Sequence, residues 1–282
     1  MLPCGQQRRF STANRFHRRR IVSVGLSGHM NGCLPGDGEG TPLHREHIRS
    51  DSRSRAERTE ILGIVLLPEV YTLTGNRVDE YLSLPKILWI KNHRPQVYRR
   101  TAYFLNSKDY LQFRSTGVLG ETDYSDASLV STMDLQSRCW ADALIREPGL
   151  DPAKFPLIRE STALAGGITR EAATALGLAE GVPVVVDAGD AACATRGTGV
   201  MDPFAVCACI GSSAWISTLA ETPCIDPDMR IQNFFDLDGR KCNICGTVQS
   251  AGITADWVIS LVSGYPVERG GLCAAGCPGN LR

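Results

Sequence analysis

A chain of 282 residues with 43% hydrophobic residues is long enough for one large α/β domain or two smaller ones around a packed core. Its 30 basic and 30 acidic residues balance to zero formal charge, which excludes a general electrostatic surface for nucleic acid and favours a small molecule as partner. The longest apolar stretches, residues 61–67 and 182–186, are far shorter than the roughly 20 residues of a membrane-spanning helix, so we expect no membrane span.

The basic N-terminal segment differs in composition from the rest of the chain. Residues 1–20 contain six arginines and no acidic residue, which is typical of a mitochondrial transit peptide. Pro3 and Gly5 argue against the amphipathic helix that such a peptide forms. We interpret this segment as a disordered or wrongly assigned start, with targeting as the weaker alternative.

The eleven cysteines lie mostly in apolar runs such as residues 204–210, where thiols behave as small hydrophobic groups. This pattern indicates a reducing compartment, so we expect a cytoplasmic protein. Cys242 and Cys245 form a C-x-x-C pair, and Cys273 and Cys277 follow, so four thiolates could hold zinc. The alternative places the first pair on a strand and the second in a Gly-rich tail. We favour that alternative and assign no metal ligand.

Three patterns mark the first half of the chain. Residues 21–26 form a β-branched run that ends in glycine and predicts a buried strand. Residues 35–40 predict a hairpin turn, because Asp-Gly supplies the positive φ angles of a tight turn. From residue 53 to about 150 the apolar spacing predicts mainly helices.

The next region predicts a helix, a strand and a second helix. Thr169 is the expected N-cap of a short helix with Glu171 in its first turn, and Gly177 ends it. Residues 182–186 are fully apolar and predict a central strand. A tight turn and a closely packed helix of small residues follow in residues 187–194.

A new set of strands is expected at residues 205–210 and 214–219, broken by Gly211-Ser212-Ser213. We therefore expect a domain boundary near residue 199. After residue 262 the composition shifts to Gly, Cys and Pro without periodicity. The order of elements predicts an α/β fold.

Asp190 is the first candidate for chemistry. Ligands of open α/β sheets bind beyond the carboxyl ends of strands, and Asp190 follows the strand expected at residues 182–186. A carboxylate there could accept the proton of a hydroxyl that attacks a phosphoryl group, and Gly189 and Ala191 would let a substrate approach the backbone. The alternative is a structural N-cap of the following helix.

Gly211, Ser212 and Ser213 are the second candidate. Between two strands, their backbone N–H groups and hydroxyls could contact phosphate oxygens. An ordinary hairpin turn is an equally good interpretation of the residues alone.

Many short segments, in the same order, resemble the FGGY family of carbohydrate kinases, and most closely its xylulokinase-like members. The resemblance runs from about residue 21 to 262 and rests on residues 24–32, 50–54, 73–76, 85–89, 108–111, 122–128, 189–192, 211–213 and 246–257. It implies a ribonuclease-H-like (actin-like) ATPase fold, in which two domains close over a cleft. The first domain holds the sugar and the second holds ATP.

The resemblance also implies how the chain is divided. We expect a basic non-homologous segment at 1–20, a truncated sugar-binding domain at 21–199, the start of the ATP-binding domain at 200–262, and a non-homologous tail at 263–282. The β-hairpin with an Asp-x-Gly-Thr motif that opens family members has no counterpart before Ile21. We therefore expect an incomplete first domain, with an unpaired sheet edge that favours aggregation, and only the start of the second domain.

By resemblance, Asp190 matches the family's general base, and Met30 and Asn31 match the pair that contacts the sugar. Xylulokinases usually carry His where this chain has Asn31, and Asn where it has Ala191. These departures leave another ketose or a polyol open as the substrate.

Gly211, Ser212 and Ser213 match the turn that family members place near the ATP phosphates. The resemblance therefore implies ATP and Mg²⁺ as cofactors, a sugar or polyol as substrate, and leaves a homodimer open. It implies ATP-dependent phosphorylation of a ketose or polyol hydroxyl. The alternatives are a catalytically inactive sugar-binding remnant and, well behind, a zinc-binding interaction module.

Overall fold

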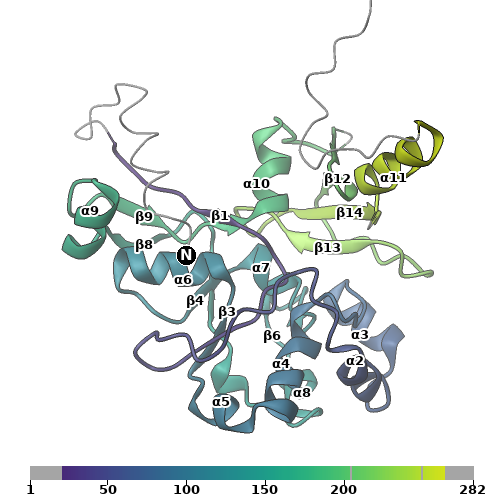
Figure 1. The fold of residues 1–282 in the computed structure, drawn as a ribbon, viewed down its shortest axis with the longest axis horizontal. Helices are drawn as coiled ribbons and strands as arrows, with labels where there is room; N and C mark the ends of the chain where they lie inside the picture. Colours follow the sequence, from purple (N-terminus) through teal and green to yellow (C-terminus); the bar gives the residue numbers. More distant parts are fainter. Residues whose placement is uncertain (1–20, 204, 249, 264–282) are drawn as a thin grey trace, which may run out of the picture. The chain divides into compact units, whose positions relative to one another are not determined.

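The computed structural model describes residues 21–203, 205–248 and 250–263 (Figure 1). Residues 1–20 and most of the Gly/Cys-rich tail, with Cys273 and Cys277, lie outside the described residues, so the predictions made for them stay predictions. The chain divides into two compact units, Met1–Cys207 with Ser217–Cys245, and Ala208–Ile216 with Gly246–Arg282. Residues 217–245 belong to the first of these units, and the domain boundary expected near residue 199 stays a prediction.

The region from residue 53 to 150 is mainly helical, as predicted. Its helices are α2 (Arg55–Leu62), α3 (Leu67–Thr74), α4 (Ser83–His93), α5 (Pro95–Arg100), α6 (Ser107–Thr116), α7 (Tyr124–Ser128) and α8 (Asp142–Arg146). Its short strands, which the helical periodicity did not predict, are β3 (Tyr103–Leu105), β4 (Glu121–Asp123), β5 (Met133–Asp134) and β6 (Cys139–Trp140). The 3₁₀-helix η2 (Pro152–Lys154) and strand β7 (Leu157–Arg159) follow, and β7 pairs in parallel with β4.

Two segments of the first unit that are far apart in sequence, near residues 24–28 and 183–189, lie side by side (Figure 1). Strand β1 (Ser27–Gly28) pairs in parallel with β10 (Ala188–Gly189), and Val24 forms a parallel bridge with Val184. On the other side of the 183–189 segment, β8 (Leu164–Gly167) pairs antiparallel with β9 (Pro183–Val185). The predicted central strand is therefore confirmed, with neighbours on both sides.

The prediction of a buried strand at residues 21–26 is wrong. Only Val24 of this run forms a bridge, and Val22 is 80% exposed. The regular pairing begins later, at β1, which pairs with β10. A β-branched run thus predicts extended backbone, whereas its burial depends on neighbours that are distant in sequence.

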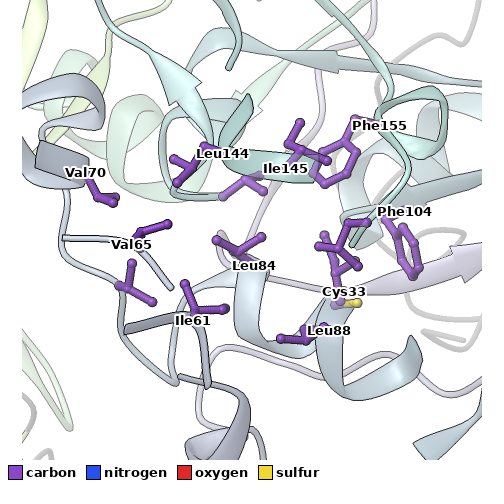
Figure 2. Close-up of a cluster of buried hydrophobic side chains, with 14 of the residues drawn as sticks. Cys33, Ile61, Val65, Val70, Leu84, Leu88, Phe104, Leu144, Ile145 and Phe155 are labelled. Carbon is purple, nitrogen blue, oxygen red and sulfur yellow. The ribbon is translucent and has the colours of Figure 1, made fainter. Parts of the chain in front are cut away.

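The largest cluster of buried hydrophobic side chains joins the helices α2, α3, α4 and α8 to the β2–β3 pair (Figure 2). Strand β2 (Leu34–Gly36) pairs antiparallel with β3. Labelled members of the cluster in Figure 2 are Cys33, Ile61, Val65, Val70, Leu84, Leu88, Phe104, Leu144, Ile145 and Phe155. Cys33 behaves as a small hydrophobic residue there, and burial raises the pKa of its thiol.

The structure confirms the predicted cap of α9 and the hairpin turn at residues 35–40, with one correction to the turn. Helix α9 (Arg170–Leu176) starts at the N-cap Thr169, whose hydroxyl accepts from the Ala172 N–H, and ends at Gly177 in the left-handed conformation. The hairpin turn after Gly36 also forms, with the Asp37 carboxylate accepting two backbone N–H groups. Its positive φ lies at Gly40 (77°), so the expectation that Asp37-Gly38 would supply it is wrong.

Beyond α10 (Asp190–Gly197), four strands form a sheet in the order β11-β12-β14-β13. They are β11 (Val206–Ile210), β12 (Ala214–Ala220), β13 (Gln232–Phe235) and β14 (Cys242–Val248), and helix α11 (Gly252–Ser263) follows. The strands predicted at 205–210 and 214–219 are thus confirmed. In the part of the chain that the structure describes, no helix combines the length and apolar character needed to cross a membrane.

Candidate functional site

Asp190 lies where the chain leaves β10 and enters α10. Gly189 is the N-cap of this helix, and Asp190 is its first residue, so the N-cap interpretation of Asp190 is wrong. A negative charge in the first helical turn is favourable because it faces the positive end of the helix dipole. Asp190 therefore stands at the carboxyl end of a strand, as the sequence predicted; the residue as a whole is exposed, whereas its carboxyl group is partly buried.

The surroundings of Asp190 raise its pKa above the ordinary value. Partial burial of the carboxyl is the main cause, because it disfavours the charged form. The Ala191 N–H and the positive charges of Arg49 and His29 act in the opposite direction. A carboxylate with a raised pKa is a stronger proton acceptor than an ordinary aspartate.

Met30 packs directly against the residue before Asp190. A Cβ atom on Gly189 would collide with the Met30 side chain, so this close contact depends on glycine. Met30 is buried, and it follows β1, which pairs with β10. The structure therefore brings two of the predicted site residues, Met30 and Asp190, to the same end of the β1–β10 pair.

Asn31 has an unusual conformation and an unused side-chain acceptor. Its φ is 65°, in the left-handed region that asparagine tolerates better than most residues. Its side chain is buried, and among the described residues its Oδ1 atom has no hydrogen-bond partner. A buried amide oxygen without a partner is costly, so it is a good candidate to bind a hydroxyl donor of a ligand.

Sequence reasoning missed a histidine and a glutamate beside this pair. His29 Nε2 lies 3.3 Å from Glu46 Oε2, and His29 Nδ1 lies 3.2 Å from the Met30 carbonyl oxygen. Both partners are acceptors only, so the imidazolium form satisfies both contacts. Consistently, the hydrogen bond to Glu46 raises the pKa of His29, and Asp190 adds to the effect. His29 belongs to the 24–32 segment, but Glu46 is too distant in sequence to be paired with it.

A buried ionic cluster lies behind β10. Lys108 Nζ is 2.9 Å from Asp109 Oδ1, 3.3 Å from Asp123 Oδ1 and 3.5 Å from Asp126 Oδ2, and all four side chains are inaccessible to solvent. Burial disfavours the charged lysine, but the three carboxylates outweigh it and raise the pKa of Lys108. Burial raises the pKa of Asp126, and the nearby carboxylates of Asp123 and Asp109 raise it further. The single ammonium group of Lys108 lowers it but does not offset these effects.

The cluster is connected to the start of α10 by two hydrogen bonds. Ser125 Oγ donates to Asp123 Oδ2 (2.6 Å) and accepts from the Gly189 N–H (2.9 Å). Ser161 Oγ also donates to Asp123 Oδ2 (2.8 Å). The backbone of the residue before Asp190 is thus held by a buried polar network, which fixes the start of α10.

Gly211, Ser212 and Ser213 form a turn between β11 and β12, within the second unit. The Gly211 N–H donates to the Ser213 carbonyl oxygen (2.8 Å). The Gly211 and Ser212 carbonyls accept from the N–H groups of Gly252 (2.9 Å) and Ala251 (2.8 Å), so the turn receives the start of α11. Ser212 is exposed and Ser213 half-buried, which leaves these residues open to a phosphate contact.

The C-x-x-C pair lies on a strand, as the non-metal interpretation expected. Cys242 and Cys245 are buried on β14, and burial raises the pKa of each thiol to about 12. Burial in an apolar environment is consistent with thiols that act as small hydrophobic groups. Within the described ranges, no group of three or more His, Cys, Asp or Glu side chains could hold a metal ion.

The α/β fold thus places the Asp190 carboxylate at a strand end, with Met30 and the unpartnered Oδ1 atom of Asn31 on the segment that follows the paired strand. Residues 6–197 match the N-terminal domain model of the FGGY family of carbohydrate kinases. The chain belongs to this family. The match extends into the basic N-terminal segment and ends close to residue 199.

Similar proteins agree with this assignment. The xylulose kinase of Bacillus subtilis (strain 168) is 31% identical over 242 residues, which are 84% of this chain and 47% of that protein. The autoinducer-2 kinase of Escherichia coli O9:H4 (strain HS) is 30% identical over 217 residues, which are 75% of this chain and 40% of that protein. The chain spans about half the length of the curated relatives that it matches.

Solved structures confirm the expected ribonuclease-H-like/actin-like fold. The crystal structure of a xyloylose kinase from Brucella ovis matches with a TM-score of 0.82 and 27% identity, covering 93% of this chain and 53% of that chain. The xylulose kinase structure from Rhodospirillum rubrum also has a TM-score of 0.82, at 25% identity, covering 89% of this chain and 50% of that chain. The fold prediction is therefore confirmed for the part of these longer proteins that this chain covers.

Proposed function

We propose that this chain binds a ketose or polyol beside Met30, Asn31 and Asp190, and that Asp190 is the general base for its ATP-dependent phosphorylation. The observation that carries the proposal is the placement of the Asp190 carboxylate at the end of β10, with Met30 packed against Gly189. The raised pKa of Asp190 supports a role in accepting a proton.

The chemistry is a transfer of the γ-phosphoryl group. Asp190 accepts the proton of the sugar hydroxyl while the hydroxyl oxygen forms a bond to the γ-phosphorus of ATP, and the bond to the β-phosphate oxygen breaks to release ADP. Because Asp190 is exposed, its proton can return to solvent. ATP brings the phosphoryl group, Gly211, Ser212 and Ser213 would contact its phosphates, and Mg²⁺ would offset the charge.

Substrate choice is expected to depend on Asn31 and Ala191. The unpartnered Oδ1 of Asn31 can accept a hydrogen bond from a sugar hydroxyl. The side chain of Ala191 has no polar atom, so it cannot form the hydrogen bond to a sugar hydroxyl that an amide side chain could form at this position. Xylulose is a natural first candidate because of the named relatives, and other ketoses and polyols follow.

The remaining parts of the proposal are a cytoplasmic location and a homodimer. Buried thiols such as Cys33 and Cys207 support a reducing compartment. The homodimer has no support from the described contacts and stays an expectation.

Calorimetry with a panel of ketoses and polyols, together with an assay for sugar-dependent ADP formation, tests the proposal. Asp190→Asn should keep sugar binding and lower turnover by roughly a hundredfold or more. Asp142→Asn is the matched control, because Asp142 also stands in the first turn of a helix and is exposed. Sugar binding without turnover in the unchanged chain would favour the inactive sugar-binding remnant. A chain that binds no member of the panel would contradict the proposal.

A further inference from the structure

Lys86 of α4 is fully buried, and its ammonium group is bound only by backbone carbonyls in the described part of the chain. Its Nζ atom donates to the carbonyl oxygens of Asn31 (2.7 Å), Ile48 (2.9 Å) and Tyr81 (2.8 Å). An ammonium group has three N–H donors, so these three carbonyls use all of them. The contacts join three segments that are far apart in sequence.

Burial of a lysine without a carboxylate partner lowers the stability of a folded protein. In the described ranges, the recorded hydrogen bonds of Lys86 Nζ all go to backbone carbonyls, and Asp51 and Glu46 act on it only through their charge. Removing a charge from water costs several kcal/mol unless dipoles or ions replace the solvent. The carbonyls supply those dipoles, so the lysine is tolerated because the three segments must be held in one arrangement.

One of those segments carries the proposed sugar contact. Lys86 binds the carbonyl of Asn31, and Ser83 Oγ of the same helix donates to the carbonyl of the next residue, Gly32 (2.9 Å). Ser83 and Lys86 are three residues apart and therefore lie on one face of α4. The Gly32 N–H is bound as well, by Asn106 Oδ1 (2.8 Å).

This anchoring accounts for the conformation of Asn31. A left-handed backbone costs about 1 kcal/mol for a residue with a side chain, so surrounding contacts must hold it. Since the carbonyl is fixed by Lys86, the side chain is free to present Oδ1, which has no partner among the described residues. This unpartnered buried oxygen is open to a hydrogen-bond donor of a ligand.

We propose that Lys86 is a positioning residue for sugar recognition: by binding the Asn31 carbonyl, it fixes the direction in which the Asn31 amide meets a sugar hydroxyl. This inference rests on the proposed function for the identity of the ligand. The anchoring of residues 29–32 by Lys86 is independent of the proposed function and can be measured without sugar.

The protonation of Lys86 provides a readout. Burial lowers the pKa of Lys86 to about 8, and Arg49 lowers it further, whereas Cys33, Asp51 and Glu46 act in the opposite direction. His47 is also close enough to feel the charge of Lys86. Above pH 8 the neutral amine has two N–H donors for three carbonyls, so one segment loses its anchor.

Affinity and stability should then change in opposite directions. Sugar affinity should fall as pH rises through about 8, because the Asn31 segment loosens. The charged lysine is unfavourable in the folded state, and this cost is fully present below the folded pKa and is lost as pH rises towards the unfolded value. The free energy of unfolding should therefore rise over the same pH interval, which a purely structural lysine would not combine with weaker binding.

The experiment compares Lys86→Met with the matched control Lys91→Met. Lys91 lies on the same helix and also donates to a backbone carbonyl, that of Pro148 (2.9 Å), outside the proposed site. We expect Lys86→Met to weaken sugar binding by about tenfold or more, by calorimetry, and to speed amide hydrogen exchange of residues 29–32 without sugar. Lys91→Met should change neither.

Unchanged affinity and exchange in a folded Lys86→Met chain would overturn the inference. If Lys86→Met does not fold, the unsubstituted chain decides: sugar affinity that stays constant through about pH 8 would overturn it equally. If the unsubstituted chain binds no sugar, the proposed function fails, and faster exchange of residues 29–32 in Lys86→Met would still support the anchoring role.

Discussion

Asp187 gives a sharp test of the electrostatics around the site. It lies between β9 and β10, is 5% exposed, and has a φ of 74°, in the region that favours glycine. Burial raises the pKa of Asp187 to about 7, and Asp123 adds to the effect, whereas the Leu26 backbone and Lys108 oppose it. Its Oδ2 atom has no hydrogen-bond partner among the described residues.

The raised pKa has a defined consequence for stability. The unfolded chain loses the Asp187 proton near the ordinary aspartate value, whereas the folded chain keeps it to about pH 7. The free energy of unfolding therefore falls as pH rises between these two values and is level above the folded pKa. A difference of about three pKa units corresponds to about 4 kcal/mol, which is the upper bound of the effect.

Asp187→Asn removes the titration while keeping the shape of the side chain. We expect the variant to be more stable than the unsubstituted chain by about 2 to 4 kcal/mol at about pH 8, and nearly equal to it at about pH 4. Urea unfolding followed by tryptophan fluorescence measures the difference, with Trp89 and Trp140 in the first unit and Trp215 and Trp257 in the second. Asp187→Gly is a second variant, which should also relieve the left-handed backbone by about 1 kcal/mol.

A stability difference between Asp187→Asn and the unsubstituted chain that does not change between these pH values would refute the linkage. Destabilisation by Asp187→Asn at about pH 8 would show that the ionised carboxylate has a favourable partner in the fold.

The remaining predictions concern the site. Ser125→Ala leaves the buried Gly189 N–H without an acceptor, so unfolding should become easier by about 1 to 3 kcal/mol, measured by urea titration, and Ser137→Ala is an exposed control. Asn31→His should shift binding preference towards D-xylulose, and unchanged relative affinities across the calorimetric panel would count against Asn31 as a specificity residue. Glu46→Gln should lower the pKa of His29, because it removes the main cause of the rise, and proton NMR of the imidazole would detect this.

Features that depend on residues adjacent in the sequence could be predicted from the sequence. The Thr169 cap, the Gly177 stop and the apolar run at 182–186 each follow from local backbone preferences, and the structure confirms all three. The position of Asp190 after a strand follows from the same local pattern. The burial of residues 21–26 does not, because it depends on how many strands pair with them.

The polar surroundings of the site could not be predicted, because they join distant residues. His29 meets Glu46 across 17 positions of the chain, and Lys86 meets Asn31 across 55. A lysine in an otherwise apolar helical pattern, such as Lys86, looks like an ordinary exposed residue in the sequence. Only its position in the fold shows that it is buried and binds carbonyls.

Lys86 and Lys108 stabilise two different segments of the candidate site. Lys86 binds the carbonyl of Asn31, on the segment that follows β1. Lys108 pairs with Asp123, whose carboxylate accepts from Ser125 Oγ, and Ser125 Oγ in turn accepts from the Gly189 N–H, which precedes Asp190. Under the proposed function, the sugar contact and the general base would therefore be held in place by separate buried cations. Since neither cation lies on the segment that it holds, Lys86→Met should affect binding of the sugar, whereas Ser125→Ala should affect the position of the base. A double variant should show nearly additive losses of stability if the two anchors are independent, and coupling between them would show that β1 and β10 move as one body.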